Sequence, residues 1–193
     1  MKIKDRMYYR LYFMKSPSEQ GTPPSEMDWE NPTIYETLEH WDMVCKSFPY
    51  DIMGAAKQLP NNDFPDEDGI EVYVPPVGGL PLKEQTVELE FVMCSEYARE
   101  NMLKFRDFIT GRDGSGVLLG IYDSYTGLSG VNVVYQSFKP DIYWRREGTS
   151  EIVTFKVEFL FTEPMEMNRV IHPANGDFND DFNDDFLKEY VYN

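Results

Sequence analysis

Two short runs of the chain place residue types that bind phosphate or calcium at a suggestive spacing. The run GRDGSG at 111–116 is glycine-rich, but it lacks a Gly-Lys-Ser/Thr ending and follows an expected helix, whereas a phosphate loop joins a strand to a helix. Asp177, Asn179 and Asp181 have the spacing of the first ligands of a calcium loop. Phe182 stands where that loop needs glycine, and Lys188 where it needs a bidentate glutamate. We therefore predict a turn at 111–116, no metal site and no cofactor.

Residues that could act as nucleophiles or general bases are few and scattered. His40 and His172 are the only histidines, and neither lies beside a serine or cysteine in a recognisable nucleophile motif. Cys45 and Cys94 have no metal-ligand spacing and are expected to be reduced and partly buried. Carboxylates are abundant, but in so acidic a chain the sequence does not separate a hydrolytic pair from solvated surface. The chain is predicted not to be an enzyme. Of the functions that we consider, a hydrolase with an acidic site ranks last.

Aromatic side chains offer a different chemistry, the binding of a ligand by ring contacts. Tyr122, Tyr125 and Tyr135 belong to expected strands or to the turn DSYTG at 123–127, in which Gly127 is expected to have a positive φ. Tyrosines on a half-buried sheet are typical packing residues, and we interpret these three in that way. A carbohydrate- or peptide-binding β-sandwich that uses the tyrosines and Trp144 is the alternative function.

The charge balance argues against tight binding of nucleic acid. Eighteen basic and 34 acidic residues give a net charge of −16, whereas wrapping a phosphate backbone requires clustered Lys and Arg. An acidic surface would instead let DNA slide along it. The apolar runs are too short to span a bilayer, and the first residues, MKIKDRMYYRLYF, make a poor signal peptide. Synthesis in the cytoplasm is therefore expected.

The elements that must position any site are clearest between residues 86 and 162. TVELEFVMC (86–94) is apolar at every second residue, SEYARENMLKFRDFIT (95–110) has helical spacing, and VLLGIYDSY, GVNVVYQSF and EIVTFKVEFLF read as strands. This order predicts an α+β, β-dominated fold. We expect a small antiparallel β-barrel or split β-sandwich with one main flanking helix and an inserted helix.

The same periodicity predicts the core. Alternation places one face of two strands inside, namely Val87, Leu89, Phe91, Val153, Phe155, Val157 and Phe159. The helix should pack on this face through Ala98, Met102, Phe105 and Ile109. Ser95 is predicted to cap the start of the helix, and Gly111 to end it in a left-handed conformation.

Earlier parts of the chain carry weaker patterns. MYYRLYFMK (7–15) predicts a first strand, and residues 16–32 are rich in Pro, Ser and acidic residues, as in an exposed loop. Residues 33–48 are predicted to be helical because Ile34, Leu38, Trp41 and Cys45 recur at helical spacing, with Thr33 as N-cap. IEVYV (70–74) predicts a short strand. We interpret residues 1–173 as a single β-barrel-like domain with an insertion at 16–62.

The last 20 residues, 174–193, form an acidic aromatic tail. Phe178, Phe182, Phe186 and Tyr190 recur every four residues among five aspartates, so a helix here would present an aromatic stripe. A solvated, partly disordered tail and an arm that docks on a neighbouring subunit are both open interpretations. These four residues, together with Trp29 and Trp41, are our candidate subunit contacts. The 33–48 segment, in contrast, is expected to pack on its own domain.

The order of elements resembles phage tail-tube and distal-tail proteins, the latter part of the baseplate hub. The resemblance covers residues 64–164 and the first strand, 7–15. It rests on VELEFVM, LKFRDFITGRDG, LLGIYDSYTGLSGVNVVYQSF and a final strand closing on TEP, preceded by DFPDEDGIEVYVPP. In that family a small β-barrel or split sandwich with one helix forms a ring, usually of six subunits, around a channel through which DNA passes. The insertion at 16–62 replaces a shorter hairpin, and the acidic tail has no counterpart.

The resemblance implies a structural component of a phage or prophage tail, found in the virion after assembly in the host cytoplasm. Its partners would be further copies of itself in an oligomeric ring and other tail or baseplate proteins, with no membrane. DNA would pass through the channel without tight binding. A protein of this form that is not phage-derived would be cytoplasmic.

Overall fold

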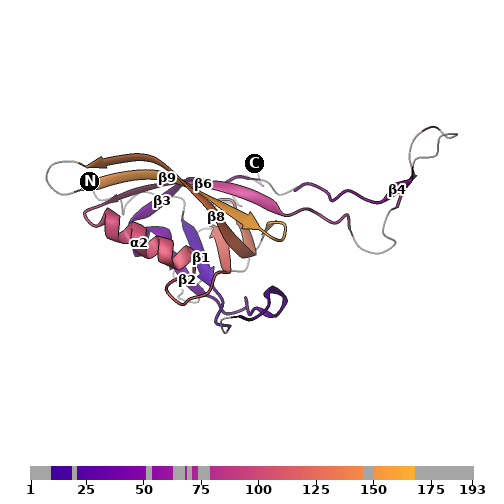
Figure 1. Ribbon diagram of the computed structural model, residues 1–193, viewed down its shortest axis with the longest axis horizontal. Coiled ribbons are helices and arrows are strands. Elements are labelled where there is room, and N and C mark those ends of the chain that lie inside the picture. The colour runs from indigo at the N-terminus through magenta and orange to yellow at the C-terminus, as the bar shows by residue number, and fades with distance from the viewer. Residues whose placement is uncertain are drawn as a thin grey trace, which may run out of the picture.

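The computed structural model describes residues 10–18, 21–50, 54–62, 68, 71–73, 79–145 and 150–167. Most of this part forms one antiparallel sheet with the strand order β2-β1-β7-β8-β9-β6-β3, and β10 adds to β8 (Figure 1). The strands are β1 (Leu11–Lys15), β2 (Thr33–Glu36), β3 (Met43–Ser47), β6 (Gln85–Ser95), β7 (Leu119–Asp123), β8 (Leu128–Arg145), β9 (Glu151–Phe161) and β10 (Glu166–Met167). The helices are α1 (Thr37–Trp41), α2 (Ala98–Ile109) and the short 3-10 turn η2 (Pro24–Glu26).

The sheet is open, although its two ends are covalent neighbours. The edge strands β2 and β3 stand at opposite ends of the strand order, but only α1 and Asp42 separate them in the chain. A helix of five residues is about 7.5 Å long, so the sheet must curl until its two edges come near each other. The sheet does not close into a barrel. The α+β, β-dominated fold class is confirmed, in its split form.

The predicted core is confirmed. All seven predicted strand residues are buried, and they face Phe13 of β1 and the rings of α2. Phe91 and Phe155 stack with ring centroids 5.5 Å apart. Each such ring removes a large apolar area from water, which makes this aromatic cluster the main stabilising element of the fold.

Helix α2 covers the inner face of the sheet, below β6 and β9 in Figure 1. Ala98, Phe105 and Ile109 are buried and Met102 is partly so, as predicted, while Asn101 and Phe108 are also buried. The helix begins three residues later than expected, because β6 continues to Ser95. The predicted cap is wrong, because the N-cap residue of α2 is Tyr97, which makes no side-chain capping bond. The Ser95 hydroxyl accepts a hydrogen bond from the backbone N–H of Tyr97 at 3.1 Å, before the helix begins.

Gly111 ends α2 as predicted, with φ of +68°. A Cβ at this position would lie 2.7 Å from the backbone of Gly116, so only glycine fits. Gly127 has a positive φ of +72° in the turn between β7 and β8, also as predicted.

The predicted helix at 33–48 is wrong in extent. The segment is strand β2, the five-residue helix α1 and strand β3. Asp42 stops α1 because it adopts a left-handed conformation, with φ of +52°. Trp41 and Cys45 are both buried, but Cys45 belongs to a strand, so their helical spacing was coincidental. Thr33 is the first residue of β2 and not a helix cap.

Other boundaries differ less. β1 begins at Leu11, and the predicted strand residues 7–9 lie outside the described part. The strand predicted at 70–74 is described only as β5 (Glu71–Val72) with Tyr73. The cysteines are free, but only Cys45 is buried, and Cys94 is exposed. Among the helices that the structure describes, none combines the length and apolar character needed to cross a bilayer.

An arm projects from the body at the end of β6. It is an antiparallel ribbon in which β4 (Asn61–Asn62) pairs with β5, and nearer the body Lys57 N–H donates to Pro81 O at 2.7 Å and Lys83 N–H to Ala55 O at 2.7 Å. Figure 1 shows β4 standing well apart from the sheet, beyond the end opposite the β8–β9 tip. We refer to the described residues of 54–85 as the arm.

Candidate functional site

The middle of the outer face of the sheet carries a ladder of paired charges. Glu88 on β6 accepts hydrogen bonds from Lys156 at 2.7 Å and from Lys139 at 2.9 Å. Lys139 also donates to Glu158, and Lys46 of β3 pairs with Glu90 of β6. The three lysines and three glutamates balance. This ladder is therefore not the acidic wall expected of a surface along which DNA slides.

The pairing changes the protonation equilibria within the ladder. The hydrogen bonds that the Lys139 ammonium donates to Glu158 and Glu88 raise the pKa of Lys139 to about 12. The hydrogen bonds from Lys156 and Lys139 lower the pKa of Glu88. Lys139 and Glu88 therefore both stay charged near neutral pH, and the ladder keeps its polar character.

The outer face becomes apolar toward the tip of the β8–β9 hairpin. In an antiparallel sheet, residues directly opposite each other point to the same side. The registers therefore place two rows side by side, Val44–Val92–Thr154–Ile142 across β3, β6, β9 and β8, and Cys94–Ile152–Trp144 across β6, β9 and β8. Both rows are apolar except for Thr154, whose hydroxyl donates to Asp141 Oδ2 at 2.8 Å. Ile142 is 55% exposed and Trp144 51%. We name as the tip patch Val44, Val92, Cys94, Ile142, Trp144 and Ile152.

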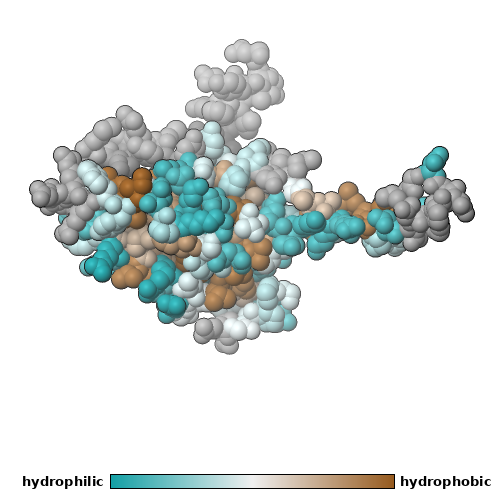
Figure 2. All heavy atoms as spheres, turned by 45° about the horizontal axis from the view of Figure 1, so that its top comes forward, coloured by the Kyte–Doolittle hydropathy of each residue, from teal (hydrophilic) through white to brown (hydrophobic). Residues whose placement is uncertain are grey.

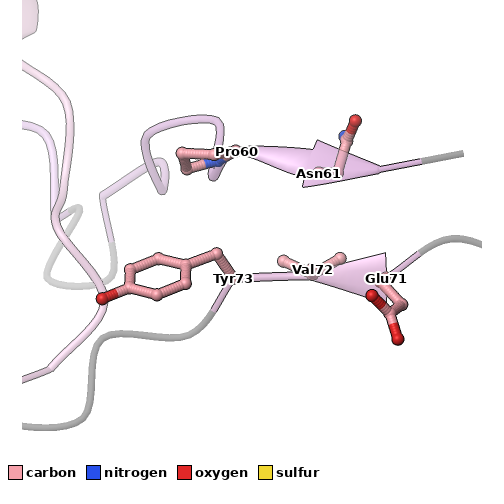
Figure 3. Close-up of a pocket in the computed structure, with 5 residues that line it drawn as sticks. All are labelled: Pro60, Asn61, Glu71, Val72 and Tyr73. Atoms are coloured by element: carbon pink, nitrogen blue, oxygen red, sulfur yellow. The ribbon is translucent and has the colours of Figure 1, made fainter.

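The arm also exposes apolar side chains. Val72, Tyr73 and Leu80 are all largely exposed. Figure 2 shows hydrophobic groups along the arm as well as on the body. Pro60 and Asn61 on one strand face Glu71, Val72 and Tyr73 on the other across a shallow hollow (Figure 3). The described residues of this hollow offer only Asn61 and Glu71 as polar side chains, and these two do not converge on a common point.

A second hollow lies where the end of β3 approaches the β7–β8 turn. Its lining residues are Lys46, Ser47, Phe48, Tyr50, Asp123, Tyr125 and Thr126. Asp123 is buried and accepts hydrogen bonds from Thr126 N–H at 2.8 Å and Oγ1 at 2.7 Å, so its carboxylate closes the turn. The rings of Tyr50 and Tyr125 are exposed at this hollow, whereas Tyr122 and Tyr135 are partly buried in the sheet.

The candidate contact residue Trp29 lies against its own domain. Its Nε1 donates to Oδ1 of Asn132 at 3.1 Å. Asn132 is buried, and its Nδ2 donates in turn to Pro24 O and Glu163 Oε1, each at 3.3 Å. The Trp29 ring also approaches Gly120, where a Cβ would lie 3.2 Å from it. The insertion is thus pinned to β7 and β8 by contacts that the sequence did not indicate.

Trp41 is a core residue. Only 4% of it is exposed, and its ring packs edge-to-face against Phe13 and Phe105. Its side chain therefore contributes to the domain's own core, in line with the expectation that the 33–48 segment packs on its own domain. The other candidate contacts, Phe178, Phe182, Phe186 and Tyr190, lie outside the described residues.

His40 and Cys45, the candidate reactive residues nearest the core, are held by contacts within the fold. His40 Nδ1 lies 3.1 Å from the backbone O of Glu36, and its ring contacts Tyr35 and Trp41. Burial raises the pKa of the Cys45 thiol to about 12, which keeps it protonated. Within the described ranges no group of three or more His, Cys, Asp or Glu side chains could hold a metal ion. His172 lies beyond the described part.

Comparisons with known proteins give no relative from which a role could be transferred. No family model, curated protein or solved structure matches the chain.

Proposed function

We propose that this chain is a structural component of a phage or prophage tail, of the tail-tube or distal-tail type, that assembles into a ring around the DNA channel. The observation that carries the proposal is the arm. It is a ribbon two strands wide that extends away from the body and exposes Val72, Tyr73 and Leu80. Such a ribbon is marginally stable by itself in water, so a neighbouring surface that covers it would stabilise it.

The body supports the same role. Its sheet is antiparallel, with α2 against the inner face, and is compatible with the split sandwich that the resemblance to tail proteins implies, although the sheet does not close into the barrel that is the other form. Part of the β8 edge lacks a neighbouring strand, because pairing with β7 ends at Val133 in the described chain. Open sheets present edges and faces through which copies associate. The proposed partners are further copies and other tail proteins.

Sedimentation velocity of the full-length protein over a wide concentration range tests this function. We expect discrete oligomers whose proportion rises with concentration, and no retention of duplex DNA at physiological salt, because the chain has a net charge of −16. A monomer at every concentration, or tight DNA binding, would contradict the proposal.

The alternative, a carbohydrate- or peptide-binding module, has one observation in its favour. The hollow beside the β7–β8 turn displays the exposed rings of Tyr50 and Tyr125 next to polar groups. Aromatic faces beside hydrogen-bonding groups are a common form of ligand site. A glycan array with the Tyr125→Ala variant as control separates the two functions: binding that depends on Tyr125 would favour the module.

A further inference from the structure

The segment 33–40 bridges the two edges of the sheet, and we refer to it as the seam. It consists of β2 and the first four residues of α1. The chain is anchored on both sides of it. Before the seam, Trp29 Nε1 donates to Oδ1 of Asn132 at 3.1 Å, and after it the side chain of Trp41 is buried in the core. The seam therefore has two fixed ends, and its middle is held by its own contacts.

The contacts of the seam itself are few in comparison with the rest of the sheet. β2 pairs with β1 over four residues, whereas β6 pairs with β9 over eleven. α1 has five residues, and its N-cap residue, Glu36, makes no side-chain capping bond. A helix this short is not stable by itself. Thr37 is buried, and the Tyr35 ring lies 4.8 Å from that of Phe108, centre to centre. Segments with few contacts open locally at a lower free energy than the strands of the core.

The buried side chain of β2 is a carboxylate. Of the four residues of the strand, only Glu36 is buried, with 8% of its surface exposed. Its Oε2 lies 3.5 Å from Nη1 of Arg10, whose side chain is partly exposed. This distance is beyond the usual range of a hydrogen bond, so the pair replaces little of the hydration that the carboxylate loses. The ionised form of Glu36 therefore destabilises the closed seam.

Other titratable groups also lie around Glu36. They are Arg10 and Tyr12 at β1, Tyr122 one strand further on β7, and Glu39 and His40 on α1. Burial is the largest influence and raises the pKa of Glu36, while Arg10 and His40 oppose this effect and Glu39 adds to it. Burial also raises the pKa of Tyr12 and of Tyr122 above 10.0, so both phenols stay neutral near neutral pH. The closed seam thus favours a protonated Glu36 more than water does.

We propose that the seam opens and recloses while the rest of the sheet stays folded, and that loss of the Glu36 proton favours the open form. In the open form Glu36 is hydrated and has an ordinary glutamate pKa, which is lower than in the closed form. The closed form therefore binds the proton more tightly, and opening increases as the pH rises through the pKa of the closed form. An open seam leaves β1 at the edge of the sheet, where its backbone groups are available to a further strand. The opening takes place within one copy, so the inference does not rest on the proposed function.

Hydrogen exchange of the full-length protein, resolved to single amides and measured at pH 5 and pH 7.5, tests the opening. The intrinsic exchange rate at each pH, divided by the observed rate, gives a protection factor for each amide. We expect the seam amides to be several-fold less protected than those of β6 and β9 at both pH values, which identifies a separate opening. The protection of the seam should fall several-fold between pH 5 and pH 7.5.

Substitutions assign the response to Glu36. Glu36→Gln is neutral at every pH, so its seam protection should be the same at both pH values and several-fold higher than that of wild type at pH 7.5. Two controls should keep the wild-type response: Glu39→Gln, at an exposed residue of the same helix, and His40→Gln, at a residue type that titrates in this range. A wild-type seam that does not respond to pH, a response that persists in Glu36→Gln, or one that disappears in His40→Gln, would overturn the proposal. So would seam amides that exchange only together with those of β6 and β9.

Discussion

The indole Nε1 of Trp29 donates a hydrogen bond to Oδ1 of Asn132 at 3.1 Å, which joins the insertion to the longest described strand, β8. Asn132 holds a left-handed conformation with φ of +56° and is buried. Asparagine tolerates this conformation better than most residues, and here its amide also serves three partners. Asn132 thus adopts the left-handed conformation that β8 requires at this position and also holds the loop that contains Pro24 and Trp29.

Asn132 variants should separate these two roles. Asn132→Gly removes the hydrogen bonds but suits the positive φ, whereas Asn132→Ala loses the bonds and adds backbone strain. We expect both to lower the free energy of unfolding in urea, and the alanine variant to be less stable than the glycine variant by about 1 kcal/mol. Equal stabilities would show that the conformation of Asn132 is not strained for alanine.

The stacked rings of Phe91 and Phe155 allow the assigned core to be tested by mutation. Both are fully buried, with β6 and β9 placing them opposite each other. Phe91→Ala or Phe155→Ala should lower the free energy of unfolding by about 3–5 kcal/mol, because each leaves a cavity. Phe138→Ala, a partly exposed neighbour of Phe155, is the control and should cost much less. Similar losses for all three would contradict the assigned core.

Asp42 connects three elements. Its Oδ2 accepts hydrogen bonds from Ser95 Oγ at 2.6 Å and from Asn101 Nδ2 at 3.0 Å, so it ties the α1–β3 corner to β6 and α2. Asp42→Gly keeps the positive φ but leaves the buried amide of Asn101 without this acceptor. We expect a loss of about 1–3 kcal/mol in the free energy of unfolding. In a double-mutant cycle with Asn101→Ala, additive effects would show that the two residues are not coupled.

Because of Lys15, the free energy of unfolding should increase as the pH rises above about 8. Burial lowers the pKa of Lys15 to about 8, while its ammonium contacts the Gly116 carbonyl and lies 4.7 Å from the Phe108 ring centre. The unfolded chain has a lysine pKa of about 10.4, so between these values it binds more protons than the folded chain, and stability rises with pH. Urea unfolding from pH 7.5 to 9.5 should show this rise in wild type and a smaller one in Lys15→Met. Equal slopes would contradict it.

The periodicity of the sequence was enough to predict β6, β9, α2 and the core, because alternation and helical spacing follow directly from which side chains are buried. The periodicity gave a wrong prediction at 33–48. There Trp41 belongs to a helix and Cys45 to a strand, the two elements meet at Asp42, and both side chains are buried. β8 also runs seven residues past the predicted end at Phe138. Pro140 is compatible with the strand because, among the described residues, this part of β8 pairs only with β9.

The candidate site was less predictable than the fold. The tip patch draws on four strands, and its rows exist only once the registers are known. Of the arm, the sequence predicted only the short strand at 70–74. The ribbon was missed because its backbone pairs join residues about 10 to 30 positions apart, and local periodicity does not reveal such pairs. Trp29 and Trp41 were both singled out as aromatic excess, but only the fold reveals that Trp41 is a core residue and that Trp29 has Asn132 as its partner.

Electron microscopy of negatively stained full-length protein, at a concentration where sedimentation detects oligomers, tests the central claim most directly. The account predicts class averages of closed rings with an axial hole wide enough for duplex DNA, and arms that bridge adjacent subunits. Compact dimers without a hole, or isolated monomers at every concentration, would contradict it.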